Sequence, residues 1–359
     1  LLEDPAPEEK IRQGITTEIL GQDGLSVAPI EEDNIPLVKQ VVAGLLGKPN
    51  VNWNWLSLKE YFERLNQKGL PVNVGYLVPH GLVRMIAMGM ENRAPTNDEL
   101  RVMKDVLVEA MEHGALGMST ALILAPCSYA NSEELSELNK EVSQFDGVFA
   151  IHVRSEGQHL IESIGEAIDI CEKSGVALQI SHMKAFGKAN WHKPPQVLEM
   201  IDQAVERGLR VSGDQYPYIA GITLLSACLP QWVLAGGPEL CIKRLVEQRN
   251  EIKEWFLKGV EVWDNRSISI GWENIIISSV ETDRNRWTVG LSIKEIADYR
   301  KVDPVDALCD LLVDEELAVI HSSVYGCEEN IITYMTYPRT MICTDGIYAK
   351  RPHPRLFGT

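Results

Sequence analysis

Short apolar segments that end on a polar residue recur about every thirty residues through the middle of the chain. The residues that end them are Ser119, His152, His182 and Asp214, at intervals of 33, 30 and 32 residues. Such an interval accommodates one β-strand plus the crossover helix that a parallel connection requires. The interval therefore predicts parallel strands joined by helices, which is an α/β fold.

The stretches between these segments have helical periodicity. Apolar side chains fall on one face in residues 160–173 and again in 196–207, and another helix is expected near 97–113. We expect strands near residues 16–20, 72–78, 115–119, 147–151, 176–181, 209–213 and 340–344. Polar residues at the carboxyl ends of several strands favour a (β/α)8 TIM-like barrel, which builds its active site there. The sequence has no glycine-rich phosphate loop of the kind that an open doubly wound sheet usually carries.

The regular interval breaks between Asp214 and Asp345. The break contains apolar runs at 275–280 and 317–322 and helical patterns near 237–258 and 292–313. We expect one barrel domain over residues 1–359, incomplete at both ends, with an insertion or subdomain at 230–335 after the seventh strand. One of the two apolar runs could instead be a true barrel strand.

The charge and cysteine content exclude several classes of protein. The formal net charge of −17 argues against binding to nucleic acid or to an anionic membrane, because phosphate groups attract clustered lysine and arginine. The seven cysteines are scattered and form no CxxC pair, which favours a reducing compartment. No apolar run reaches the roughly 18 residues that span a bilayer, and the first residues do not resemble a signal peptide. We therefore expect a cytoplasmic protein.

Three side chains at predicted strand ends can form a hydrolytic site. Two imidazoles at the ends of neighbouring parallel strands, about 5 Å apart, can share one divalent ion, so His152 and His182 are candidate metal ligands. They could instead be a hydrogen-bonded pair. Asp345 follows the last predicted strand, where a carboxylate can accept a proton from an activated water. In isolation it would be a turn residue or helix cap.

Several motifs together resemble the N-acyl-D-amino-acid deacylase (D-aminoacylase) branch of the amidohydrolase superfamily. They are HVRSEG at 152–157, QISHMK at 179–184, DQYPY at 214–218, TDG at 344–346 and RPHPR at 351–355. The resemblance covers nearly the whole chain, in order. It implies a metal-dependent hydrolase, with one or two divalent ions and zinc the leading candidate, that converts an N-acyl-D-amino acid to a carboxylate and a free D-amino acid.

The resemblance also implies roles for matched residues. His152 and His182 would bind the metal, and Asp345 would be a further ligand or the general base. Lys184 and Arg355 would hold the carboxylate of the amino acid, a task that suits the planar fork of arginine.

Further matched positions have alternative interpretations. Tyr216 would line the pocket or pack in the core, and His353 could contact the substrate. Asp23 stands where the family often has a cysteine ligand, so it could bind metal or only form a turn. The family often has a tyrosine near the end of strand four, where residues 122–124 are aliphatic here.

The family's first strand carries a His-x-His pair, and the first histidine of this chain is His80. We also find neither part of the family's small β-sandwich, so we expect this chain to be part of a longer protein. Within the superfamily, cyclic amidases such as dihydroorotases or hydantoinases place a lysine at the end of strand four, which is absent here. The activity of a D-amino-acid or isoaspartyl dipeptidase remains an alternative function. A catalytically silent barrel scaffold is disfavoured because His152, His182 and Asp345 are present.

Overall fold

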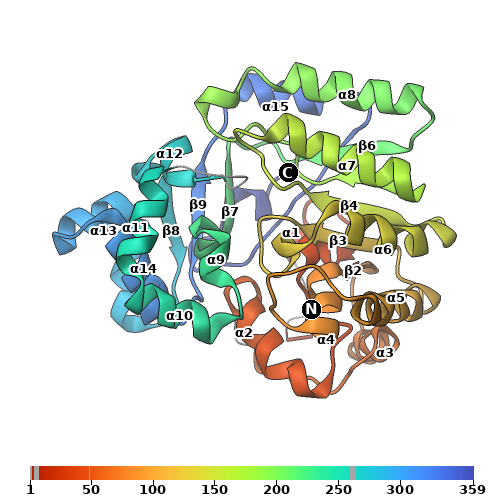
Figure 1. Cartoon of the computed structure of the whole chain (residues 1–359), viewed down its shortest axis with the longest axis horizontal. Helices are drawn as coiled ribbons and strands as arrows, with labels where there is room; N and C mark the ends of the chain where they lie inside the picture. The colour runs from red at the N-terminus through yellow and green to blue at the C-terminus, as the bar shows by residue number, and fades with distance from the viewer. Residues whose placement is uncertain (1, 4–7, 48, 259–263) are drawn as a thin grey trace.

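A parallel sheet of seven strands forms the centre of the computed structural model, which describes residues 2–3, 8–47, 49–258 and 264–359 (Figure 1). Along the sheet the strands are β1 (Thr17–Leu20), β2 (Asn73–Pro79), β3 (Gly117–Ala121), β4 (Val148–His152), β5 (Ala177–Ile180), β6 (Val211–Gln215) and β10 (Thr340–Ile342). All neighbouring pairs are parallel. The predicted α/β class with parallel strands is confirmed.

Helices cover the outer face of this sheet. They are α2 (Ile35–Leu46), α3 (Leu58–Lys68), α4 (His80–Met88), α5 (Asn97–Glu112), α6 (Ser132–Gln144), α7 (Leu160–Ser174), α8 (Pro194–Glu206) and α15 (Glu328–Met335), and the short α1 is Glu8–Ile11. Consecutive helices from α4 to α8 pack side by side, and α15 packs on α8. Local capping residues determine where these helices begin. For example, Thr96 and Glu99 form a capping box at the beginning of α5.

The sheet curls around an internal cavity but does not close. Ile19 of β1 and Met341 of β10 come from opposite ends of the strand order, yet both line that cavity. In the described residues neither β1 nor β10 has a second neighbouring strand. Both outer strands carry exposed apolar side chains, with Ile19, Met341 and Ile342 exposed by 40%, 54% and 52%. The two edges are thus unpaired and apolar.

A second, antiparallel sheet lies beside the first. Its order is β7 (Ala220–Leu224), β9 (Ile320–Val324) and β8 (Ile275–Ser279). Its helices are α9 (Gln231–Leu234), α10 (Pro238–Glu247), α11 (Arg249–Lys258), α12 (Arg266–Ile270), α13 (Ile293–Arg300) and α14 (Pro304–Asp314), and α10 to α14 occupy the left of Figure 1. The strand β8 and the surrounding helices share an apolar core that is distinct from the core of the seven-stranded sheet, whereas Leu224 of β7 packs in the core of that larger sheet.

This second sheet corrects parts of the sequence interpretation. The apolar runs at 275–280 and 317–322 supply β8 and β9, so neither is a strand of the parallel sheet. The helical pattern at 292–313 forms two helices because Pro304 lacks an amide hydrogen and begins α14 at its first position. The pattern at 237–258 is likewise two helices, and residues 259–263 of the predicted insertion lie outside the described residues.

A buried ionic network joins α4 to α6 beneath the end of β2. Arg84 and Glu134 are 0% and 2% exposed, and the Arg84 Nη1 donates to Glu134 Oε1 at 2.7 Å and Oε2 at 2.5 Å. His80 Nε2 lies 2.8 Å from the same Oε1, and His80 Nδ1 lies 2.9 Å from Thr120 Oγ1. The fixed partners of His80 identify it as part of the scaffold rather than the cavity wall.

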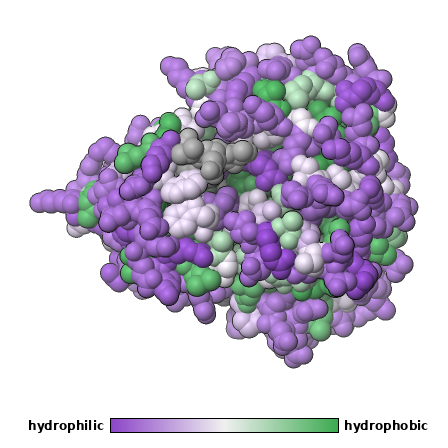
Figure 2. Space-filling view, in the orientation of Figure 1, coloured by the Kyte–Doolittle hydropathy of each residue, from purple (hydrophilic) through white to green (hydrophobic). Residues whose placement is uncertain are grey.

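The outer surface in the view of Figure 2 is mostly hydrophilic, with small separate apolar areas. Among the described residues, no helix has the length and apolar character needed to cross a membrane.

Candidate metal centre

Asp23, His152 and His182 meet at the carboxyl ends of the parallel strands. Asp23 follows β1, His152 ends β4, and His182 follows β5. His152 Nδ1 lies 3.0 Å from His182 Nε2, and that same Nε2 lies 3.6 Å from Asp23 Oδ1. One potential ligand atom from each residue lies within 4.8 Å of the others. The structure therefore brings together the two predicted histidines and the aspartate that stands at the family's cysteine position.

Asp23 is held by a tight turn braced from β3. The backbone amide of Gly24 donates to Ser119 Oγ at 3.0 Å, and the Ser119 hydroxyl donates to the carbonyl of Gly21. Gly24 has φ of +70°, and a Cβ there would lie 2.6 Å from Cys127 Sγ. Only glycine fits this position without strain, which fixes how the turn presents Asp23.

His182 is oriented by the neighbouring strand β6. Its backbone amide donates to Asp214 Oδ1 at 2.6 Å, and Gln179 Nε2 donates to the other oxygen of that carboxylate at 2.8 Å. Asp214 therefore acts as a brace for the loop after β5. Asp214, which the sequence analysis identified as the polar residue that ends this strand, therefore has a structural role.

Glu156 and Lys184 form a buried ion pair against the two histidines. The two side chains are each 6% exposed, and Lys184 Nζ donates to Glu156 Oε1. Lys184 Nζ also lies 2.8 Å from His182 Nδ1, and Glu156 Oε1 lies 3.4 Å from His152 Nε2. Lys184 is thus close to the cluster, with a carboxylate partner in this structure.

Arg355, Asp345 and Tyr216 form a second group in the same cavity. Arg355 Nη1 lies 2.6 Å from Asp345 Oδ2, and the guanidinium lies 4.5 Å from the centre of the Tyr216 ring. The Tyr325 hydroxyl donates to the Tyr216 hydroxyl at 2.7 Å. Asp345, a predicted ligand, lies outside the three-residue cluster, and its carboxylate pairs with Arg355.

Opposing effects set the pKa values in the cluster. Burial opposes ionisation of Asp23, but the adjacent imidazole of His182 and nearby cationic groups lower its pKa to about 2. Burial and Lys184 favour neutral His182, yet the carboxylates of Asp23 and Glu156 outweigh them and raise its pKa. Burial lowers the pKa of His152. The cluster therefore combines an ionised carboxylate with one neutral imidazole and one that favours its protonated form.

One cavity of about 1180 Å³ contains most of the predicted site. The predicted residues that line it are Asp23, His152, His182, Lys184, Tyr216, Asp345 and Arg355. His353 is not among its lining residues. Its Nδ1 accepts a hydrogen bond from the amide of Arg355 at 3.2 Å, and its ring packs on Tyr218. His353 is thus a cap for the turn that carries Arg355.

The backbone at three of these positions is left-handed. Asp23, His182 and Asp345 have φ of 56°, 34° and 45°, a region that residues other than glycine seldom occupy. Each lies just beyond the end of a different parallel strand. Such strained positions gather at functional sites.

Sequence reasoning assigned no role to Glu156, Tyr325 or Arg266, all of which line the cavity. The sequence could have indicated Glu156, since it lies four residues after His152 in the HVRSEG motif that resembles the D-aminoacylase family. Tyr325 and Arg266 had no such signal, because both come from the segment around the second sheet, and the sequence does not show that this segment faces the cavity.

Comparisons with known proteins agree with this geometry. No protein-family model matches the chain. A D-aminoacylase of Alcaligenes xylosoxydans xylosoxydans is 26% identical over 351 residues, which is 98% of this chain and 62% of that protein. An N-acyl-D-glutamate deacylase of the same organism is 32% identical over 224 residues, or 62% of this chain and 45% of that protein.

A solved structure has the same fold. The N-acyl-D-glutamate deacylase of Bordetella bronchiseptica, complexed with zinc and a phosphonate mimic of the tetrahedral intermediate, superposes with a TM-score of 0.80 at 26% identity. The match covers 99% of this chain and 64% of that one, so this chain spans less than two thirds of the relatives it matches. The resemblance to D-aminoacylases of the amidohydrolase superfamily is confirmed over nearly the whole chain.

Proposed function

We propose that the protein hydrolyses N-acyl-D-amino acids to a carboxylate and a free D-amino acid, and that it does so with bound metal. The observation that carries this proposal is the placement of Asp23, His152 and His182 in one cavity with Lys184 and Arg355. A metal cluster beside two cationic side chains suits a substrate that has an amide and a carboxylate. The D-aminoacylase and deacylase relatives support the same chemistry.

The cluster fits a zinc ion by its donor atoms. Two ligand atoms bonded at about 2.1 Å to a tetrahedral zinc lie about 3.4 Å apart. Two of the three separations, 3.0 Å between the histidine nitrogens and 3.6 Å from His182 to Asp23, bracket that value, and one ligand atom from each residue lies within 4.8 Å of the others. Asp23, His152 and His182 would hold the ion. When bound, the metal supplies Lewis-acid activation of water and of the substrate carbonyl.

The remaining residues bind substrate and move protons in this proposal. Lys184 and Arg355 would pair with the α-carboxylate, with Tyr216 beneath it, and this would fix the configuration of the amino acid that can react. Asp345 would accept a proton from the attacking water and return it to the amine leaving group. Because Asp345 and Arg355 are paired in this structure, a bound carboxylate must compete for Arg355, which would release Asp345 to act as base.

We further propose that an additional strand between β10 and β1 completes a (β/α)8 barrel. The unpaired apolar edges support this, since such a strand would cover Ile19, Met341 and Ile342. The expected His-x-His pair would then reach the same cavity. The predicted barrel domain at 1–359 and subdomain at 230–335 stay proposals, supported by the separate apolar core around the second sheet.

A cytoplasmic location is likewise proposed. It rests on the seven cysteines, which are all free.

The test assays the full-length protein on N-acetyl-D-amino acids, their L-enantiomers, hydantoin and D-dipeptides, with zinc and after chelation. We expect D-specific, metal-dependent deacylation. Asp345→Asn should remove most turnover while substrate binding is largely kept. His159→Asn, which changes a histidine outside the cavity, serves as the control. Preference for hydantoin or dipeptides, or activity without metal, would contradict the proposal.

A further inference from the structure

The two ring nitrogens of each histidine in the cluster face different partners. Nδ1 of His152 and Nε2 of His182 lie 3.0 Å apart, and the latter lies 3.6 Å from Asp23 Oδ1. The opposite nitrogens, Nε2 of His152 and Nδ1 of His182, lie 3.4 Å and 3.5 Å from a single atom, Glu156 Oε1. One buried carboxylate oxygen therefore lies against the two nitrogens that the proposed metal would leave free.

Those free nitrogens need a hydrogen-bond acceptor when the histidines bind a metal. A neutral ring has one N–H, and the nitrogen that binds the metal is unprotonated, so the proton lies on the other nitrogen. In the described part of the chain, the buried Nε2 of His152 forms no hydrogen bond. Lys184 Nζ lies 2.8 Å from His182 Nδ1, but an ammonium only donates and cannot accept a proton from that nitrogen. Glu156 is the acceptor next to both rings.

Hydrogen bonds from two other parts of the chain hold Glu156 in place. Its amide donates to Asp264 Oδ2 at 2.7 Å, and its carbonyl accepts from the Phe186 amide at 2.7 Å. Asp264 also accepts from the Ser155 hydroxyl at 2.7 Å and from the Gly157 amide at 3.2 Å. A Cβ at Gly157 would lie 2.8 Å from Asp264 Oδ1, so a larger residue would displace this carboxylate.

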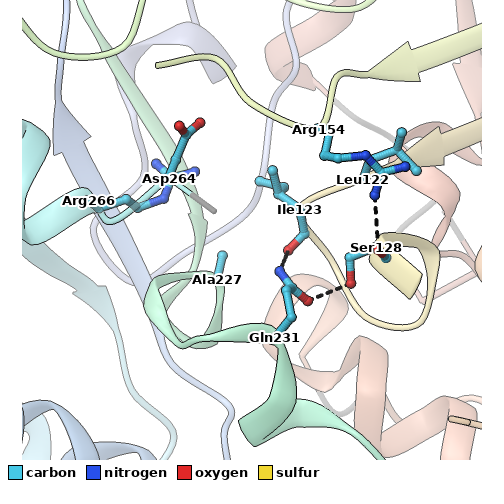
Figure 3. Close-up of a pocket in the computed structure, with 8 residues that line it drawn as sticks. All are labelled: Leu122, Ile123, Ser128, Arg154, Ala227, Gln231, Asp264 and Arg266. Atoms are coloured by element: carbon cyan, nitrogen blue, oxygen red, sulfur yellow. Dashed lines mark hydrogen bonds between the residues drawn. The ribbon is translucent and has the colours of Figure 1, made fainter. Parts of the chain in front are cut away.

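Asp264 belongs to the segment around the second sheet. It comes just before α12 and lines a small cavity of about 30 Å³, where Figure 3 shows it beside Arg266 and across from Arg154. Its hydrogen bonds to residues 155–157 join that segment to the loop after β4, the strand that ends on His152. The second sheet is thus connected to the histidine cluster through Asp264 and Glu156.

We propose that Glu156 is a positioning residue of the metal centre. Its carboxylate accepts the N–H of both metal-bound imidazoles, which fixes their tautomers and their ring orientations, and Asp264 fixes Glu156. A carboxylate behind a histidine ligand also makes the ligand more basic. This inference rests on the proposed function, in which Asp23, His152 and His182 hold zinc.

The experiment measures zinc affinity of the full-length protein by competition with a chelator, in the absence of substrate. Glu156→Met keeps the length of the side chain and removes the acceptor, so zinc affinity should fall roughly ten- to hundredfold. Glu156→Gln keeps an oxygen acceptor without the charge and should give an intermediate loss. Glu166→Met is the matched control, because Glu166 also pairs with an arginine, Arg154, but lines neither cavity. Unchanged affinity in Glu156→Met, or an equal loss in Glu166→Met, would overturn the proposal.

A second comparison removes the effect of the unpaired lysine. Glu156→Met leaves the buried ammonium of Lys184 without its carboxylate, which can destabilise the fold. Lys184→Met is therefore compared with the double variant Lys184→Met/Glu156→Met, in which no unpaired charge remains. The double variant should bind zinc more weakly than Lys184→Met. Equal affinities would show that Glu156 serves only to neutralise Lys184, and the proposal would fail.

Nuclear magnetic resonance of the zinc-loaded protein labelled with [15N]histidine observes the tautomers directly. In the wild type we expect protons on Nε2 of His152 and on Nδ1 of His182, protected from exchange with water. In Glu156→Met these protons should exchange faster, whereas Glu166→Met should leave them protected. Protons on the opposite nitrogens in the wild type would contradict the proposal.

Asp264→Asn tests the connection to the second sheet. It should weaken zinc binding less than Glu156→Met does, and the variant that combines both changes should bind zinc no more weakly than Glu156→Met alone, because Asp264 acts through Glu156. Additive losses would show that Asp264 acts independently, contrary to the proposal.

The zinc measurements separate this inference from the proposed function. A protein that binds zinc but hydrolyses no N-acyl-D-amino acid would refute the deacylase proposal, and the affinities of the Glu156 variants would still test Glu156. Metal-dependent deacylation with zinc affinity that is independent of Glu156 would refute this inference alone.

Discussion

Replacement of Glu134 by glutamine tests whether the buried network of Glu134, Arg84 and His80 stabilises the fold. The change keeps the size of the side chain but removes the charge that faces Arg84 and His80. Breaking a fully buried ion pair from one side costs about 3–5 kcal/mol. Arg84 Nη2 keeps two carbonyl acceptors, Glu91 O at 3.2 Å and Arg93 O at 3.0 Å. We therefore expect a loss near the lower limit, about 3 kcal/mol.

The assay is equilibrium unfolding in urea, followed by tryptophan fluorescence. Glu137→Gln is the matched control on the same helix, because the side chain of Glu137 is 30% exposed and its pair with Lys104 should contribute less than about 1 kcal/mol. Adding Arg84→Met to Glu134→Gln should recover part of the loss, since it removes the uncompensated charge. If Glu134→Gln and Glu137→Gln unfold at the same urea concentration, the reasoning about the buried network is wrong.

Three further predictions concern the site and its supports. Asp23→Ala should weaken zinc binding at least roughly tenfold, as measured by competition with a chelator, and an unchanged affinity would remove Asp23 from the ligand set. Gly24→Ala should destabilise the fold by roughly 2 kcal/mol in urea, and more than Gly114→Ala, because Cys127 lies where the new methyl group would go whereas nothing lies within 4 Å at Gly114. Burial lowers the pKa of His80, but the neighbouring Cys127 thiol and Glu134 carboxylate outweigh burial and raise it to about 9, so the stabilising contribution of His80 should be complete below about pH 6.5 and lost as the pH rises through 9. Urea midpoints across that range should fall in the wild type and much less in His80→Gln.

Much of the parallel sheet could be predicted because the sequence patterns that indicate its strands and helices are local. Strands that end near His152, His182 and Asp214 follow from apolar runs separated by amphipathic helices, and all appear within a few residues of their predicted positions. The strand β7 was missed because residues 220–224 include glycine and threonine and lack an alternating pattern. Its pairing depends on β9, about one hundred residues later, and such long-range contacts have no local signature.

The candidate site could be predicted only in part, for a similar reason. Strand ends located His152 and His182, and Asp23 and Asp345 were both candidate ligands. In the structure Asp23 Oδ1 lies 3.6 Å from His182, whereas Asp345 pairs with Arg355, and which strand end approaches the histidines has no local signature in the sequence. Arg266 could not have been predicted, since its place beside Phe186 results from the packing of the second sheet against the first.

The left-handed backbone at Asp23, His182 and Asp345 sets stability and activity against each other. Each costs roughly 1 kcal/mol or more that glycine would not. Glycine at Asp23 or His182 should relieve this strain and remove a side chain of the proposed metal site, whereas glycine at Asp345 would also leave the buried guanidinium of Arg355 without its carboxylate and should destabilise the fold. Selection for thermal tolerance alone would therefore favour glycine at Asp23 and His182, in conflict with the proposed activity.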